Sequence, residues 1–132
     1  MQNAEIPKIV LVVDDDLFTA QLTSFFLEQA GYNVVLGEGG VDALEKMAGD
    51  PAIAIVVSDM NMPFLSGVEL FAELRRQGDM RPFILLTGED IAPLILAHPG
   101  IDAVIKKDEH LEDTLPELVG SLLSNVHTGE QL

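Results

Sequence analysis

The chain has 132 residues, 48% hydrophobic but only 5% aromatic, which suits one domain with an aliphatic core. It has no cysteine, so disulfides and thiolate metal sites are excluded. Its 22 acidic and seven basic residues give a net charge of −15, which argues against direct binding to nucleic acid or an anionic membrane. With no signal peptide and no run long enough to cross a bilayer, we expect a soluble cytoplasmic protein.

The first part of the chain alternates between short apolar runs and helical patterns. After a polar lead-in, Ile9–Val13 is predicted to be a buried strand that ends at three consecutive aspartates. A helix is predicted over Leu17–Ala30, with Asp16 as its N-cap and Gly31 after its end. The helical pattern is the three- and four-residue spacing of Phe18, Leu22, Phe25, Phe26 and Gln29.

A second strand, a short helix and a central strand follow. The strand is predicted over Asn33–Leu36 and the helix over Val41–Met47. Ile53–Val57 is a nearly unbroken apolar run, rich in β-branched residues, and is predicted to be a strand buried on both faces. It stops at Ser58 and Asp59, which places the Asp59 carboxylate at the carboxyl end of a buried strand.

The second half of the chain repeats the alternation. Ser66 and Glu69 have the capping-box spacing, which predicts a helix that runs to Gln77. The next elements are a strand, a short helix and another strand: Pro82–Leu86, Ile91–Ala97 and Ala103–Ile105. Pro93 would weaken the short helix unless it lies in the first turn. A last helix is expected to begin near Glu112 or Asp113, with Pro116 near its first turn. Residues 127–132 are expected to form a polar tail.

Five strands that alternate with five helices predict an α/β fold with a parallel sheet and helices on both faces. We expect one domain over residues 1–132, with its core over about residues 8–126. The chain shows no internal repeat or linker.

Polar residues follow four of the five strands. Because parallel strands end at the same edge of a sheet, these side chains are expected to meet there. The residues are Asp14 and Asp15, Asp59, Thr87 and Lys107. Clustered carboxylates repel one another unless a cation neutralises them, and oxygen ligands suit Mg²⁺. With a lysine and a hydroxyl, they would surround a phosphoryl group as phosphoryl transfer requires.

These residues resemble a known family. Val-Val-Asp14-Asp15, Ser58-Asp59-Met-Asn-Met-Pro63 with Gly67 following, Leu-Leu-Thr87-Gly and Lys107 are similar to the motifs of the CheY-like receiver domains of two-component signalling. The resemblance covers about residues 8–126. It implies a flavodoxin-like (βα)₅ fold with strand order 2-1-3-4-5.

The resemblance also implies roles for the residues. Asp59 would accept a phosphoryl group from a histidine kinase or a histidine phosphotransfer protein. Mg²⁺ would be held by Asp15, Asp59 and the backbone carbonyl of Asn61, with Asp14 acting through water. Thr87 and Lys107 would contact the phosphoryl group, and Asn61 and Glu89 would tune dephosphorylation. Such a domain catalyses its own phosphorylation and dephosphorylation without being a conventional enzyme.

Three features depart from the family pattern. Asp108 follows the lysine where proline is usual, and the stretch between Thr87 and Lys107 is short and contains Pro93. Val104 stands where the family has a switch aromatic, so the usual coupling of the threonine to a ring cannot operate. We therefore expect intact phosphorylation chemistry with an unusual relay. With no effector segment in the sequence, an unknown downstream protein would receive the signal, and phosphorylation could cause dimerisation.

Two alternatives remain at this point. Asp14-Asp15-Asp16 satisfies the Asp-x-Asp motif of haloacid-dehalogenase-type Mg²⁺ phosphatases, although the threonine usual after it is missing and Asp59 would have no role. The second alternative is a phosphorylation-inert receiver that serves only as an interaction module. A flavodoxin is excluded, because acids stand where a phosphate-binding loop would follow the first strand.

Overall fold

The computed structural model describes residues 8–130, with side chains through residue 124. One parallel sheet has the order β2-β1-β3-β4-β5, which confirms the expected fold. Its strands are β1 (Ile9–Val13), β2 (Asn33–Gly37), β3 (Ile53–Asp59), β4 (Phe83–Thr87) and β5 (Ala103–Lys106). The helices are α1 (Leu17–Gln29), α2 (Gly40–Gly49), α3 (Gly67–Arg76), α4 (Ile91–Ala97) and α5 (Leu111–Glu130). No helix among the described residues is both long and apolar enough to span a membrane.

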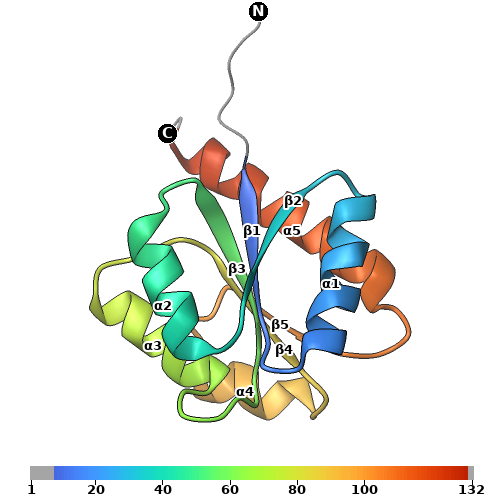
Figure 1. Ribbon diagram of the computed structural model, residues 1–132, viewed down its shortest axis with the longest axis horizontal. Coiled ribbons are helices and arrows are strands. Elements are labelled where there is room, and N and C mark those ends of the chain that lie inside the picture. Colours follow the sequence, from blue (N-terminus) through green and yellow to red (C-terminus); the bar gives the residue numbers. More distant parts are fainter. Residues whose placement is uncertain (1–7, 131–132) are drawn as a thin grey trace, which may run out of the picture.

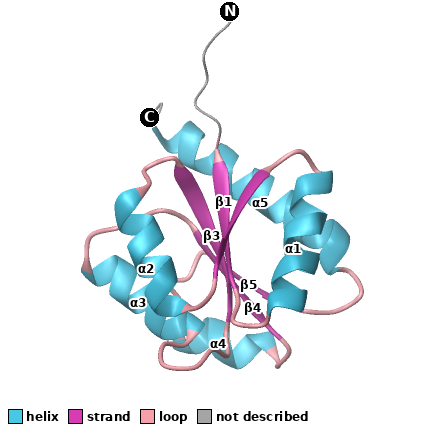
Figure 2. Ribbon diagram, in the orientation of Figure 1, coloured by secondary structure: helices cyan, strands magenta, loops and turns pink. Residues whose placement is uncertain are grey.

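The sheet separates two layers of helices (Figures 1 and 2). Helices α1 and α5 cover one face, where Leu27, Leu115 and Val119 pack on residues of β1, β3 and β4. Helices α2, α3 and α4 cover the other face, where Leu70 and Leu74 contribute to a second core cluster. Successive residues of a strand point to opposite faces, so the two layers explain why the central strands are apolar at nearly every position.

The predicted helix caps are confirmed. The Asp16 carboxylate accepts hydrogen bonds from the backbone N–H groups of Phe18 and Thr19, at 3.0 and 3.2 Å. Ser66 and Glu69 form the reciprocal capping box at the start of α3. These caps fix where α1 and α3 begin, and therefore the loops that carry the acidic residues.

The buried face of α1 differs from what its spacing of large apolar residues suggests. Phe18, Leu22 and Phe25 expose 73%, 44% and 52% of their surface. The buried positions are instead Ala20, Thr23, Ser24 and Leu27. Small side chains let α1 lie close to the sheet, and the Ser24 hydroxyl donates to the carbonyl of Ala20, which satisfies it inside the fold.

Helix α5 corrects two expectations. It begins at Leu111, so Pro116 lies in the second turn rather than the first. Leu111, Leu115 and Val119 anchor the helix on the sheet, and their burial offsets the loss of the backbone hydrogen bond that Pro116 cannot donate. The helix continues through Glu130, so the backbone of residues 127–130 is helical where a tail was expected. Residues 131 and 132 lie outside the described part of the chain.

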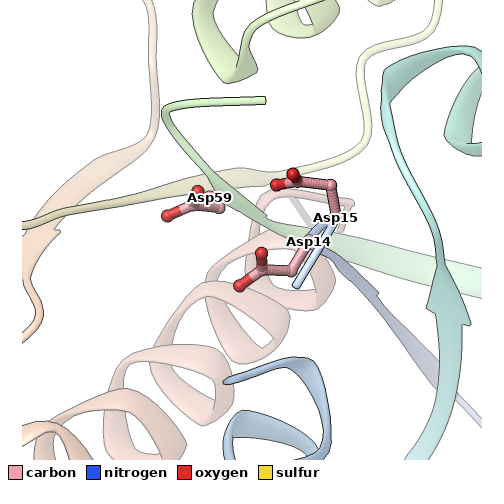
Figure 3. Close-up of side chains that lie close together, drawn as sticks. All are labelled: Asp14, Asp15 and Asp59. Carbon is pink, nitrogen blue, oxygen red and sulfur yellow. The ribbon is translucent and has the colours of Figure 1, made fainter. Parts of the chain in front are cut away.

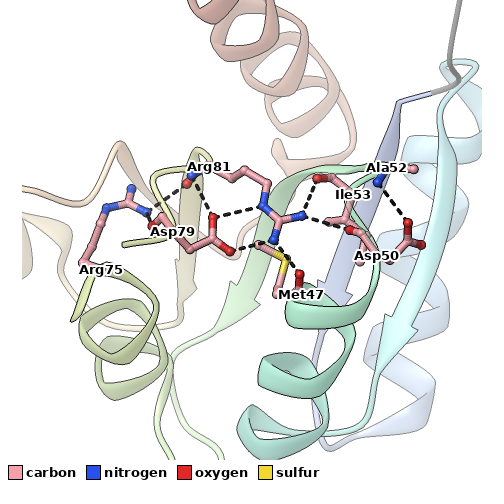
Figure 4. A network of polar contacts seen from close by, with 7 residues as sticks. All are labelled: Met47, Asp50, Ala52, Ile53, Arg75, Asp79 and Arg81. Atoms are coloured by element: carbon pink, nitrogen blue, oxygen red, sulfur yellow. Dashed lines mark hydrogen bonds and ion pairs between the residues drawn. The ribbon is translucent and has the colours of Figure 1, made fainter. Parts of the chain in front are cut away.

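Arg81 holds several segments together at the amino ends of the strands, opposite the acidic residues (Figure 4). Its guanidinium donates to the backbone carbonyls of Met47, Ile53 and Asp50 at 2.6, 2.8 and 3.1 Å, and to the carboxylate of Asp79. Burial disfavours the ionised form of Asp79, but hydrogen bonds from Arg81 outweigh it and hold the Asp79 pKa below its usual value. One side chain thus joins the end of α2, the start of β3 and the approach to β4.

Candidate functional site

Three carboxylates meet at the carboxyl edge of the sheet (Figure 3). Asp14 and Asp15 follow β1, and Asp59 ends the neighbouring strand β3; each offers an oxygen atom within 4.8 Å of the others. The pairing of Val13 with Ser58 sets this proximity, because it brings the two strand ends level. Asp14 and Asp59 each expose only 9% of their surface, whereas Asp15 faces solvent.

Lys107 and Thr87 complete the site from the other side. The ammonium of Lys107 forms an ion pair with Oδ1 of Asp59. Its backbone N–H donates to the carbonyl of Thr87 at 2.8 Å, which holds the segment after β5 against the end of β4. The buried Thr87 hydroxyl accepts a hydrogen bond from the N–H of Glu89 at 3.0 Å. Among residues 8–124, no hydrogen bond donated by this hydroxyl is found, so its proton is available to a ligand.

The charge state of Asp59 reflects its position. Burial is the main cause that raises the pKa of this carboxyl above its usual value. The hydrogen bond and charge of Lys107 oppose the rise, while the negative charges of Asp14 and Asp15 add to it. Ionised Asp59 is therefore under electrostatic stress that an additional cation would relieve.

Thr19 is a site residue that the sequence did not point to. Its hydroxyl donates to Oδ2 of Asp14 at 2.7 Å, and the N–H of Asp16 donates to Oδ1 at 3.0 Å. Both oxygens of Asp14 are thus held, and the carboxylate is fixed in place. Its position in the sequence could have suggested this contact, since Thr19 lies in the first turn of a helix that begins directly after the three aspartates.

Gly67 allows the site to close up beneath Asp59. A Cβ atom at this position would lie far inside van der Waals contact of the Asp59 carbonyl oxygen and 2.7 Å from Cδ1 of Leu85. The N–H of Gly67 also donates to the carbonyl of Met60 at 2.8 Å. Only glycine lets the start of α3 pass so close to the end of β3.

The remaining predicted residues lie around this centre. Asn61 and Glu89 are exposed on the loops after β3 and β4. Within residues 8–124, no hydrogen bond joins either side chain to the carboxylates. Val104 is buried in the core cluster on the α2, α3 and α4 face and pairs with Leu85 in the sheet. A valine there fills core space and has no ring to reorient.

The donor set fits a hard divalent cation. Three carboxylates supply only oxygen ligands, and the cluster is open to solvent at Asp15, so water can complete the coordination. Soft metals are disfavoured, because no cysteine is available anywhere in the chain. The acidic cluster can therefore bind a metal ion.

A parallel sheet of order 2-1-3-4-5 with this acidic cluster at its carboxyl edge is the arrangement of a flavodoxin-like receiver domain. The family model of the response regulator receiver domain matches residues 10–118. The chain belongs to this family, as found in two-component systems. The family assignment replaces the phosphatase alternative.

Curated relatives agree with this assignment. The response regulator MprA of Mycobacterium ulcerans is 37% identical over 111 residues, which are 83% of this chain and 47% of that protein. MprA of Mycobacterium sp. strain KMS is 35% identical over 86% of this chain and 50% of its own length. The chain spans about half the length of the curated relatives it matches.

Solved structures share the fold along nearly their whole length. The Francisella response regulator 1452 receiver domain has a TM-score of 0.83 and 28% identity, covering 90% of this chain and 98% of that one. TrrA of Thermotoga maritima, solved in complex with Mg²⁺-BeF, has a TM-score of 0.79 and 31% identity, covering 87% and 98%. The chemotaxis response regulator CheY4 of Vibrio cholerae has a TM-score of 0.77 and 28% identity, covering 88% and 98%.

Proposed function

We propose that Asp59 accepts a phosphoryl group from the phosphohistidine of a histidine kinase or a histidine phosphotransfer protein. The supporting observation is the ion pair between Asp59 and Lys107 beside two further carboxylates. An Asp59 oxygen forms the new bond to phosphorus while the bond from phosphorus to the imidazole nitrogen breaks. The nitrogen keeps the electron pair, and Asp59 becomes an acyl phosphate.

Each neighbour has a distinct task in this proposal. Lys107 moves from the free carboxylate to the phosphoryl oxygens and balances their charge. The Thr87 hydroxyl donates its proton to a phosphoryl oxygen. Asp15, Asp59 and the Asn61 carbonyl would hold Mg²⁺, with Asp14 acting through water, and the ion would supply positive charge next to the transferred group. Asn61 and Glu89 flank the route of the water that hydrolyses the acyl phosphate and set its lifetime.

The decisive experiment is incubation with acetyl phosphate and Mg²⁺, followed by intact mass measurement. The wild type should gain one phosphoryl group, and Asp59→Asn should gain none. Asp14→Asn should retain the acceptor with slower incorporation, because only the metal site is weakened. Incorporation that survives in Asp59→Asn but not in Asp14→Asn would contradict the assignment of Asp59.

The same preparation tests the inert-module alternative. An interaction module would be favoured by two results together. The protein would gain no mass from acetyl phosphate, and beryllofluoride with Mg²⁺ would not change its amide NMR spectrum. We further propose that the domain acts in the cytoplasm and passes its signal to a downstream protein. Sedimentation velocity with and without beryllofluoride tests whether phosphorylation also causes dimerisation.

A further inference from the structure

A hollow beside the acidic cluster lies between α1 and the end of β2. It has a volume of about 410 Å³, and Leu17, Ala20 and Leu36 provide its apolar wall. Asp15 and Glu38 form its acidic rim. Asp14 and Asp15 of the acidic cluster line this hollow, whereas Asp59 and Lys107 do not.

A second hollow, of about 250 Å³, neighbours the first. It also contains Asp15 and Glu38, and Val41, Pro63 and Phe64 form its apolar wall. Because Asp15 and Glu38 line both hollows, the two hollows are neighbours at the ends of β1 and β2. We refer to the two neighbouring hollows together, lined by Leu17, Leu36, Val41 and Phe64 with Asp15 and Glu38, as the edge groove.

The apolar side chains of the edge groove face water in the isolated domain. Leu17, Val41 and Phe64 expose 63%, 58% and 99% of their surface. Exposed apolar side chains that gather in a hollow with a charged rim are typical of a binding surface, whereas single exposed ones are ordinary. These three side chains bury little of their apolar surface in the fold, so they contribute little to the stability of the core.

Phe64 adds an independent observation. Its backbone has a φ of 70°, the one positive value at a non-glycine position among the described residues. A bulky side chain in this region is disfavoured, and glycine would occupy it without strain. The strain brings no compensating burial, because the ring is almost fully exposed. The ring is thus held out from the loop after β3 at a cost to the free domain.

The charge of the groove indicates the occupant. Asp42, which also lines the second hollow, is neutralised by Lys46 at 2.8 Å. Asp15 and Glu38 have no ion-pair partner within residues 8–124, and the whole chain carries a charge of −15. A second copy of this chain would bring the same negative charge, so self-association through this groove is opposed.

We propose that the edge groove binds a segment of a partner protein that carries aliphatic side chains next to lysine or arginine. The aliphatic groups pack against Phe64, Val41 and Leu17, and the cationic group pairs with Glu38 and Asp15. The docked segment lies directly beside the carboxylate cluster. This inference does not depend on phosphorylation of Asp59, because it concerns binding to the unmodified domain.

Three labelled peptides test the proposal by fluorescence anisotropy and amide chemical shifts. One carries leucine and lysine in an amphipathic pattern, one has serine for leucine, and one has glutamate for lysine. The leucine–lysine peptide should bind about tenfold more tightly than either of the others. Its binding should weaken with salt and should shift the backbone amide signals of residues 36–42, Phe64 and Leu65.

Variants distinguish specific binding at the edge groove from non-specific attraction of a cationic peptide to an acidic protein. Phe64→Gly and Glu38→Gln should each reduce leucine–lysine binding several-fold, whereas Leu96→Ser removes another largely exposed apolar side chain, outside the edge groove, and should have no effect. Phe64→Gly should melt no lower than the wild type and should still accept phosphate from acetyl phosphate. Asp59→Asn should lose phosphorylation and retain binding, so failure of the two proposals can be told apart.

Two outcomes would overturn the proposal. One is equal peptide binding by the wild type and Phe64→Gly. The other is amide shifts confined to the separate hollow between α1 and α5, lined by Phe25, Phe26 and Pro116 with Glu112, Asp113 and Glu117. Dimerisation of the free domain that Phe64→Gly abolishes would instead assign the groove to a second copy.

Discussion

The hydroxyl of Thr19 donates a hydrogen bond of 2.7 Å to Oδ2 of Asp14, and this bond ties the first turn of α1 to the acidic cluster. A ligand side chain held by a neighbour loses less conformational freedom when it binds a cation. Groups of this kind support metal affinity although they do not touch the metal.

Replacement of Thr19 by valine should therefore weaken Mg²⁺ binding by about tenfold. Valine keeps the shape of the side chain and removes only the hydroxyl. Calorimetric titration with Mg²⁺ measures the change. Thr19→Ser restores the donor and should recover most of the affinity, so equal weakening by both substitutions would show that the hydroxyl is irrelevant.

The raised pKa of Asp59 predicts how its removal changes stability with pH. In the folded protein this carboxyl holds its proton more tightly than in the unfolded chain, where the pKa is near 3.8. The stabilisation from protonated Asp59 is present below pH 3.8 and is lost as the pH rises through the folded value. Without Mg²⁺, the wild type should lose stability as the pH rises from 3.8 through the folded pKa of Asp59. Asp59→Asn has no such carboxyl and should therefore become more stable than the wild type in that pH range.

Urea unfolding of the two proteins at a series of pH values measures this difference. The gain should grow as the pH rises above 3.8 and then become constant. Lys107→Met should enlarge the gain, because it removes the cation that favours ionised Asp59. A difference that is independent of pH would contradict the assigned shift.

Gly67→Ala should destabilise the protein by about 1–3 kcal/mol, because the added methyl group meets the Asp59 carbonyl and the Leu85 side chain. The clash should also displace Asp59 and slow incorporation of phosphate from acetyl phosphate. Gly49→Ala is the matched control, since a Cβ there meets nothing within 4 Å. If both variants unfold at the same urea concentration, the close approach of α3 to β3 is not what requires glycine.

Arg81→Met should lower the free energy of unfolding by about 2–4 kcal/mol, because three backbone carbonyls and the Asp79 carboxylate lose their donor. Arg76→Met removes an exposed pair with Glu73 and should leave the free energy of unfolding nearly unchanged. Mg²⁺ affinity should be unchanged in both, since Arg81 lies at the opposite edge of the sheet. Loss of Mg²⁺ binding in Arg81→Met would show that the two edges are coupled.

The sequence could predict whatever is encoded in neighbouring residues or in strand ends. Buried strands such as Ile53–Val57 can be predicted from the sequence because they are apolar at every position. The meeting of Asp14, Asp59 and Lys107 follows from parallel topology, which brings all strand ends to one edge. The caps at Asp16 and Ser66 are local patterns of side chain and backbone, and the structure has them as expected.

Other features depend on contacts between distant segments, and sequence patterns do not contain these. Spacing alone could not tell which face of α1 is buried, because small residues such as Ala20 pack as effectively as Phe18 where the helix lies close to the sheet. The carbonyls bound by Arg81 come from segments about thirty residues away in the chain. The strain at Phe64 is a backbone property that side-chain identity does not reveal.

Helix α4 contains seven residues and buries none of them completely; Leu96 exposes 82% of its surface. Asp90, at its start, provides no side-chain hydrogen bond to the helix. Few buried contacts mean that such a segment opens at a small free-energy cost, and its amide hydrogens should exchange with solvent long before those of β3. Only Gly88, Glu89 and Asp90 separate it from Thr87. A helix with few buried contacts thus begins one loop away from the Thr87 hydroxyl at the end of β4.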